Sequence, residues 1–434
     1  MKFAASKALA ALTKEDVPDS VLRAYGVDSL KFGPDYIIPK PLDPRVLLWE
    51  APAVAGMAME TGVARKTVDI DEYREQLAYR QGKGEQVRYF FQNKARSSGG
   101  KKRIAFAEGE EQKIIRAAYQ IEEEGIGTPI LLGRPAIIEE QLRTLGIDYQ
   151  PRIVDPFTFK DLDKYRAAYY ELRGRKGITK TDAHKKVRDP NIFGPLMVKM
   201  GDADTFVSGL TYDYPDVIRP ALQIHHTANG ATRAAGVYIM IVEDRVYIFT
   251  DATVNIDPTA EDLAEIACLA AGFAKKLELE PRVAFLSFSN FGSTPHPLSE
   301  KVRKAVALVK ARCPEYPVDG EMQADSAVVP EIVEERYPFS GVKDANVLVF
   351  PSLESANIAY KLLARLGNAK AIGPILLGMG SPVQVLQTGD DVNAIVQVAA
   401  VAVMDAMNRE EKPAKKARKA AVRKPAKKVV AKKK

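Results

Sequence analysis

The stretch RIAFAEGEEQKIIRAAYQIEEEGIGTPILL, residues 103–132, decides the fold class. It opens with RIAFA, a short apolar run typical of a buried strand. Residues 110–124 then place Ile114, Ala118 and Ile121 on one face of a helix that a glycine ends. PILL follows as the next strand. This order of strand, helix and strand predicts parallel strands connected by a helix that packs on the sheet.

The same alternation continues to about Arg409, with helical stretches such as Thr259–Leu277 between short apolar runs. The runs that predict further strands are Thr205–Ser208, Val237–Val242, Val246–Thr250, Val283–Phe288, Val347–Phe350 and Val383–Leu386. Apolar strands between helices predict parallel sheets covered on both faces. Roughly 310 residues are too many for one such sheet. We therefore expect an α/β fold of two doubly wound α/β/α lobes, with ligands bound in the cleft between them.

The two ends of the chain differ in composition from this body. Residues 1–85 contain a helical opening and then four prolines between Pro34 and Pro44, which exclude a helix or central strand there. Ser97–Gly100, flanked by cations, indicates a linker at 86–102, with an ordinary surface loop as the alternative. Residues 411–434 consist almost entirely of Lys, Ala, Pro, Arg and Val, so we expect a disordered tail after a body of residues 103–410.

The net charge of +7 is a property of the tail. Lys412–Lys434 holds 12 cations and no acid, so the rest of the chain carries −5. The composition is therefore no evidence for a nucleic-acid-binding core. The tail itself is expected to bind polyanions weakly and without sequence preference, or else to aid solubility only.

Composition also excludes other classes. No apolar run reaches the roughly 20 residues of a membrane helix, and the N-terminus lacks a signal-peptide core. We therefore expect a cytoplasmic protein with no membrane partner. Two cysteines, Cys268 and Cys313, are too few for a disulfide scaffold or a cysteine zinc site, and Cys268 is expected to be a core residue. With four histidines in the chain, we expect no metal site.

The common nucleotide-binding motifs do not occur, since neither G-x-G-x-x-G nor G-x-x-x-x-G-K-[ST] is present. One loop is a candidate for binding phosphate, because it joins a predicted strand to a predicted helix through small residues. Its candidate ligand-binding residues are Ser289, Gly292, Ser293 and Thr294. Backbone N–H groups and hydroxyls of such a loop can bind phosphate, although many connecting loops have this composition.

Three further groups allow a functional or a structural interpretation. Asp319, Glu321, Gln323 and Asp325 alternate along the chain and could serve acid–base or metal chemistry, or be solvated and cap a helix. The adjacent His225 and His226 point about 100° apart on a helix, which favours a structural role. Arg173, Arg175 and Arg219 are candidate phosphate anchors, or ordinary surface cations.

Taken in order along the chain, seven stretches resemble the phosphate acetyl/butyryl transferases (phosphotransacetylases). They are RIAFAEGEEQKIIRAA, YELRGRKGIT, DADTFVSGLTYDYPDVIRPALQI, FTDATVNIDPTAEDLAEIA, DGEMQADSAVVP, VLVFPSLESANIAYKLLARLGNAKAIGPILLGM and PVQVLQTGDDVNAIV. The resemblance implies a first lobe of about 103–225 with 364–410, a second lobe of about 226–363, and a dimer or higher oligomer. It also implies acetyl-CoA contacts at the candidate loop, at Arg173 and in the segment 352–357, where Ser352 and Asn357 are the candidate residues.

Residues 1–85 resemble the end of the NAD(P)-binding domain of bacterial malic enzymes, through FGPDYIIPKPLDPR and APAVAGMAMETGVA. The whole chain thus resembles the C-terminal part of a hybrid malic enzyme. In that family the malate site, with its NADP and divalent metal, precedes the matched stretch. The resemblance therefore implies a split or truncated product, or a separate polypeptide that supplies the malic half.

The departures from the transferase pattern bear on activity. Active phosphotransacetylases carry a Ser-Arg pair in a turn, with a catalytic Asp seven residues after the serine. The matching positions here are Gln387, Thr388 and Ala394, so we identify no catalytic residue. Without the base and the phosphate-binding guanidinium, transfer is expected to fail.

The resemblance and these losses together imply an acetyl-CoA-responsive regulatory module of an NADP-dependent malic enzyme. The alternatives are an active phosphate acetyltransferase and a polyanion-binding protein that acts through its tail.

Overall fold

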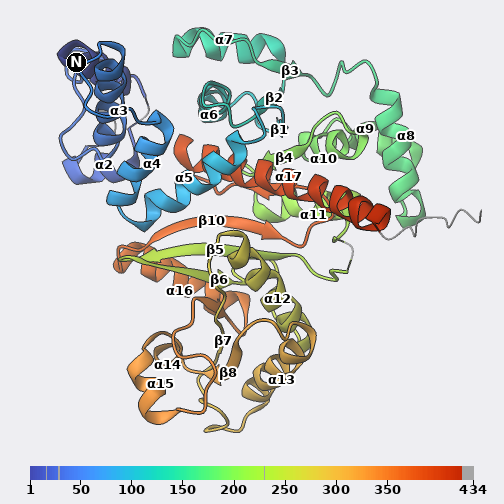
Figure 1. Cartoon of the computed structure of the whole chain (residues 1–434). Coiled ribbons are helices and arrows are strands. Elements are labelled where there is room, and N and C mark those ends of the chain that lie inside the picture. The colour runs from blue at the N-terminus through green and yellow to red at the C-terminus, as the bar shows by residue number, and fades with distance from the viewer. Residues whose placement is uncertain (16, 28–29, 229, 423–434) are drawn as a thin grey trace, which may run out of the picture.

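The computed structural model describes residues 1–15, 17–27, 30–228 and 230–422. A helical N-terminal part lies beside an upper lobe that contains one sheet, and a lower lobe contains a second sheet (Figure 1). The N-terminal helices are α1 (Lys2–Leu12), α2 (Asp19–Tyr25), α3 (Arg45–Glu60), α4 (Ile70–Arg80) and α5 (Lys83–Arg96).

The expected linker at 86–102 is shorter than predicted. Helix α5 continues to Arg96 and ends in a tight turn at Ser97–Gly100. Phe91 and Ala95 of α5 are fully buried in the core of the upper lobe. Apolar side chains at helical spacing fix this segment, so only the turn connects the helices to the first strand.

The upper lobe, lobe I, contains a five-stranded parallel sheet in the order β11-β4-β1-β2-β3. Its strands are β1 (Arg103–Phe106), β2 (Thr128–Leu132), β3 (Arg152–Val154), β4 (Thr205–Ser208) and β11 (Val383–Val385). The chain moves outward from β1 to β2 and β3, then crosses to β4 on the other side of β1. Such a reversal of strand order is where open α/β sheets bind ligands.

Helices cover both faces of this sheet, as the alternation of strand and helix predicts. Ile104 and Phe106 of β1 pack in a cluster with α6 (Gln112–Glu123), α7 (Pro135–Leu145) and α17 (Val392–Val422). Ala105 packs in another cluster on the opposite face. That face carries α8 (Leu162–Arg173), the 3₁₀ turn Gly174–Lys176, α9 (Lys180–Lys186), α10 (Pro190–Met200) and α11 (Tyr214–His225).

The lower lobe, lobe II, contains a six-stranded sheet in the order β10-β5-β6-β9-β7-β8. Its strands are β5 (Ala235–Val242), β6 (Arg245–Thr250), β7 (Val283–Leu286), β8 (Val318–Met322), β9 (Val347–Val349) and β10 (Lys370–Leu377). The expectation of a wholly parallel sheet is wrong here, because β5 pairs antiparallel with both β6 and β10. The two-residue connection between β5 and β6 forces this, since parallel neighbours need a long crossover.

The boundary between the lobes also differs from the expected one. Strand β10 falls in the range 364–410 assigned to lobe I, but its hydrogen bonds go to β5 of lobe II. One face of the lobe II sheet carries α12 (Ala260–Lys276) and α13 (Pro297–Arg312). The other carries α14 (Ala324–Val328) and α16 (Leu353–Leu366), and α15 (Pro330–Arg336) packs against α14.

Two further expectations need correction. Cys268 packs against the core as predicted, but it is joined to Cys313 by a disulfide that links α12 to α13. Helix α17 extends to Val422, into the segment expected to be disordered. Ala, Lys and Arg, which dominate that segment, are strong helix formers. Residues 423–434 lie outside the described residues, and within the described part of the chain no helix is long and apolar enough to cross a membrane.

Gly194 tests the packing of lobe I. A Cβ atom at this helical position would lie 2.1 Å from Phe206 Cε2, inside the core beneath β4. We expect Gly194→Ala to lower the free energy of unfolding by about 1–3 kcal/mol, although alanine favours helix. Gly56→Ala in α3 is the matched control, because its nearest neighbour is Ile70 Cδ1 at 3.8 Å. Urea unfolding checks both, and equal stabilities of the two variants would contradict the predicted packing.

Candidate functional site

Two neighbouring cavities lie at the carboxyl ends of the lobe I strands, where the strand order reverses. One has a volume of about 500 Å³ and is lined by loops that follow β1, β2, β3 and β4. The other, of about 430 Å³, is lined by the same β1 and β4 loops and by Gly389. Glu110, Glu111 and Thr211 line both cavities. The position agrees with the reversal of strand order. All residues that line the two cavities belong to lobe I, so neither cavity is the expected cleft between the lobes.

Glu108 fixes the loops around these cavities. Its buried carboxylate accepts hydrogen bonds from Thr211 N at 2.8 Å, Thr211 Oγ1 at 3.2 Å and Gly209 N at 3.1 Å. Burial raises the pKa of Glu108, and these hydrogen bonds oppose the rise. The carboxylate thereby joins the loop after β1 to the loop after β4.

The cations that line the larger cavity are Arg134 and Arg188, which sequence reasoning missed. Arg134 forms an ion pair with Glu110. The Nε atom of Arg188 is buried and has no hydrogen-bond partner within the described structure. A signal for Arg134 was available, because it lies two residues after the end of the second predicted strand.

The predicted arginines lie elsewhere in lobe I and do not line either cavity. Arg173 is the last residue of α8, and its buried Nε has no hydrogen-bond partner within the described structure. Arg175 is exposed in the 3₁₀ turn, and Arg219 is exposed on α11. Of the three, Arg173 is the one whose side chain is partly enclosed by protein.

The turn after β11 meets lobe II through Gln387. Its Nε2 atom donates to the hydroxyl of Tyr238 on β5 and to the carbonyl of Gly373 on β10, the latter at 3.0 Å. Tyr238 stacks on Tyr360 of α16 with ring centroids 4.0 Å apart. The Gln387 amide thus bridges the lobes and contacts the ring pair that Tyr238 and Tyr360 form within lobe II.

The acidic residues of this turn have structural partners. Asp391 accepts from Ala394 N at 2.8 Å and so caps α17. Asp390 accepts from Gln387 N at 2.9 Å, and its backbone carbonyl accepts from Lys113 Nζ. Burial raises the pKa of Asp390 to about 6. Thr388 is exposed, and no carboxylate stands at Ala394.

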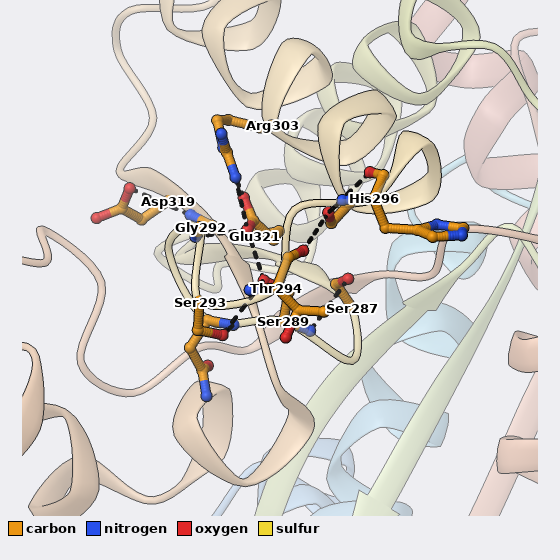
Figure 2. A network of polar contacts seen from close by, with 12 residues as sticks. Ser287, Ser289, Gly292, Ser293, Thr294, His296, Arg303, Asp319 and Glu321 are labelled. Carbon is orange, nitrogen blue, oxygen red and sulfur yellow. Dashed lines mark hydrogen bonds and ion pairs between the residues drawn. The ribbon is translucent and has the colours of Figure 1, made fainter.

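The candidate phosphate loop of lobe II is organised around Glu321 (Figure 2). This carboxylate is fully buried and accepts from Gly292 N at 2.7 Å and from Ser289 Oγ at 3.0 Å. Arg303 of α13 also donates to it, from Nε at 3.1 Å. Burial opposes ionisation, but the hydrogen bonds from Arg303, Gly292 and Ser289 outweigh it and lower the pKa of Glu321.

The polar groups of this loop are therefore turned inward. Thr294 N donates to Ser289 Oγ, Asn290 N donates to Ser293 Oγ, and Ser293 N donates to the Asn290 carbonyl. The structure brings the predicted loop residues together as expected. The backbone N–H groups of these residues already have hydrogen-bond partners. A ligand at this loop would therefore contact the exposed side chains of Ser293 and Thr294.

The acidic residues on either side of Glu321 also have structural partners. The sequence pattern did not indicate that Glu321 would organise the loop. Asp319 accepts from Ser340 Oγ and Gly341 N, and Asp325 accepts from Ser326 N. Within the described residues, no three His, Cys, Asp or Glu side chains gather as a metal site. Burial lowers the pKa of His225 to about 4, in keeping with a structural neutral imidazole.

Ser352 and Asn357 lie together at the start of α16. Ser352 Oγ accepts from Ser355 N and caps the helix, while Asn357 Nδ2 donates to the Ala252 carbonyl at 3.4 Å. Ala252 follows Asp251, a buried carboxylate that sequence reasoning did not single out. Asp251 accepts from the backbone N–H groups of Gly236, Thr253, Val254 and Asn255.

Comparison with known proteins identifies the family. Residues 88–403 match the family model described as phosphate acetyl/butaryl transferase. The chain belongs to this family. A phosphate acetyltransferase from Thermoanaerobacterium thermosaccharolyticum is 44% identical over 72% of this chain and 97% of its own length. A phosphotransacetylase from Streptococcus pyogenes, known from a crystal structure, has 40% sequence identity to this chain and a TM-score of 0.71. The match covers 74% of this chain and 98% of the Streptococcus pyogenes chain.

The similarity to malic enzymes extends over more of the chain. An NADP-dependent malic enzyme from Escherichia coli is 37% identical over 94% of this chain, and one from Rhizobium meliloti is 39% identical over 94%. The chain spans about half the length of these relatives, 55% and 54%. It thus combines a phosphate acetyl/butaryl transferase domain with sequence shared with malic enzymes.

Glu321 should be required for the shape of its loop. We expect Glu321→Ala to lower the free energy of unfolding by about 2–4 kcal/mol, because Arg303 loses its partner and Ser289 and Gly292 lose a buried acceptor. Hydrogen exchange of residues 287–296 should accelerate. Glu315→Ala, at an exposed turn, is the control. Unchanged exchange in the loop would show that Glu321 does not organise it.

Asp390 should make stability depend on pH. Its folded-state pKa of about 6 exceeds the ordinary 3.8, so the folded chain retains this proton longer. This favourable contribution is complete below about pH 4 and is lost as the pH rises through 6. Asp390→Asn should therefore raise the free energy of unfolding at pH 7.5 by about 1–3 kcal/mol and leave it nearly unchanged at pH 4. Urea unfolding across this range checks it; a difference independent of pH would contradict the shift.

Proposed function

We propose that the transferase domain is an acetyl-CoA-responsive regulatory module of a malic enzyme and does not transfer acyl groups to phosphate. The observation that carries the proposal is Gln387. At the position where active relatives have the serine of the Ser-Arg pair, its amide is bonded to Tyr238 and Gly373 of the other lobe. This amide is neither a base nor a cation, and it occupies space beside the turn.

The loss of catalysis follows from what surrounds Gln387. Thr388 cannot grip phosphate as a guanidinium does, and Ala394 cannot remove a thiol proton. The nearest carboxylates do not replace the missing base, because Asp390 and Asp391 accept backbone hydrogen bonds within the turn. Loss of a general base alone typically costs about 10²–10⁴ in rate.

Retention of ligand binding is supported by the cavities of lobe I. Volumes of about 500 and 430 Å³ are in the range of small-molecule sites. Arg188, whose buried Nε has no partner among the described residues, offers a guanidinium group to phosphates of the ligand. Arg134 offers a second one, which is paired with Glu110 in the structure. Arg173 and the Ser352–Asn357 segment, assigned by resemblance, are further contacts in this proposal.

The NADP-dependent malic enzymes that this chain resembles extend the proposal to malate and NADP for a protein of their full length. NADP and a divalent metal would then be held outside the residues described here. Acetyl-CoA would act by binding one arrangement of subunits more tightly than another. A cytoplasmic location and a homo-oligomer belong to the same proposal.

Two measurements on one preparation test this function. We expect calorimetric titration to show micromolar binding of acetyl-CoA, and a coupled assay to show no acetyl phosphate formation. Arg188→Ala should weaken binding about tenfold, whereas Arg336→Ala, at the exposed end of α15, should leave it unchanged. Absence of binding would refute the module, and turnover within about tenfold of an active relative would refute the loss of catalysis.

Active phosphate acetyl transfer is the second candidate, favoured by the 44% identity to a phosphate acetyltransferase over 97% of that enzyme. The combined variant Gln387→Ser, Thr388→Arg and Ala394→Asp separates the two. If the native turn is inactive and the rest of the site is intact, the combined variant gains measurable transfer. If the native chain is active with these residues, the substitutions bring no such gain.

A further inference from the structure

The two cysteines of the chain lie together on lobe II. Cys268 is on α12 and Cys313 directly follows the last residue of α13, and a disulfide joins them across 45 positions of sequence. Their Cα atoms are 6.4 Å apart, within the usual span of a disulfide. Both residues are half-buried and pack against the core from outside it. The bond therefore lies near the surface of the helix pair and not at its centre.

Helices α12 and α13 do not need this bond to stay together. Ala264, Ala267 and Ala271 of α12 are fully buried in the same cluster as Ala305 and Val309 of α13. Domains that depend on disulfides for folding are small ones that lack such a core. We therefore expect lobe II to stay folded when the two sulfurs are reduced. The two thiols then remain neighbours, and the bond can form again.

Helix α13 connects the disulfide to the network of Glu321 (Figure 2). Arg303 of α13 donates to Glu321 at 3.1 Å, and Lys310 in the last turn pairs with Asp319 at 3.1 Å. Both carboxylates belong to β8, the strand that follows Cys313 along the chain. The disulfide thus holds the connection between α13 and β8 against α12.

This connection has one other contact with the core. Pro314, Glu315 and Pro317 are exposed, whereas Tyr316 is half-buried and packs against the core cluster. Tyr316 N donates to the Cys313 carbonyl at 3.2 Å, so the two anchoring residues also fix each other. Opening the disulfide removes one of these two anchors and leaves the C-terminal end of α13 freer to move.

We propose that Cys268 and Cys313 are a reversible redox site that controls the order of the loop at residues 287–296. The reductant is a dithiol. One of its thiolates attacks one cysteine sulfur, breaks the bond between the two cysteines and forms a mixed disulfide. Its second thiol then displaces the attacked cysteine, and the reductant leaves as a cyclic disulfide. Two electrons and two protons thereby pass to the cysteines, and a disulfide oxidant reverses the exchange.

The position of the bond favours a redox site over a permanent structural link. Exposed disulfides are the labile ones, and a link that the core does not require is free to open. The effect reaches the loop because Glu321 accepts from Ser289 and Gly292 while it is held by Arg303 on α13. The proposal does not depend on the regulatory function, since it concerns the redox state and the order of the loop.

Thiol labelling of the full chain tests the redox site. We expect no free thiol in protein kept with oxidised glutathione. We expect two after treatment with about 1 mM dithiothreitol in buffer without denaturant, measured by the mass that iodoacetamide adds. Circular dichroism should be the same in both states, because the helices stay packed. Free thiols in oxidised glutathione, or a bond that opens only in urea, overturn the proposal.

Hydrogen exchange in the two states tests the link to the loop. We expect reduction to accelerate exchange of residues 287–296 about fivefold or more, and to leave residues 103–123 of lobe I unchanged. Cys313→Ser is the control, because this variant cannot form the bond and its loop should exchange at the faster rate with or without dithiothreitol. Equal exchange of the native loop in both states overturns the proposed control of the loop. A response of the variant loop to dithiothreitol overturns it as well, since the cause would then lie outside the disulfide.

Discussion

Burial of the first half of α17 is the constraint on which the rest of the structure depends. Ile395, Val396, Ala399, Ala400 and Val403 are fully excluded from solvent, so this helix is apolar around most of its circumference. It packs against α5 and α6, against β4 and β11 of lobe I, and against β10 of lobe II. Each buried valine or isoleucine contributes about 1.5–3 kcal/mol. One helix therefore holds the N-terminal part and both lobes together.

Buried carboxylates fix the loops that this core leaves at the ends of the strands. Glu108 joins the loops after β1 and β4, Asp251 gathers the loop after β6, and Glu321 gathers the loop between β7 and α13. Each follows a strand or ends one, and each accepts backbone N–H groups that would otherwise be unpaired. The loops at the carboxyl ends of the strands are thereby shaped from within the protein. Gln387 adds a neutral polar contact between the lobes at the same edge.

The features of the site that could be predicted are those read from local sequence. The small residues of the Ser289–Thr294 loop do lie between a strand and a helix. Gln387 lies on the turn after β11, and Ala394 lies in the first turn of α17. The direction of the loop's donors could not be predicted, because it depends on Glu321, about thirty positions away in the sequence. The same holds for Arg134 and Arg188, which come together only when three strands align.

The sequence by itself determined the α/β class and two lobes, because apolar runs and amphipathic helices alternate with periods that each segment carries locally. It also determined that Gln387, Thr388 and Ala394 stand where the resemblance implies a Ser-Arg pair and an Asp, since residue identity is independent of the fold. Only the tertiary structure decided that β10 joins lobe II, that β5 runs antiparallel to β6, and that Cys268 meets Cys313. Each of these is a pairing between segments that are far apart in the sequence. The free energy that selects such a pairing comes from side-chain packing between the segments, which the sequence of one segment does not reveal.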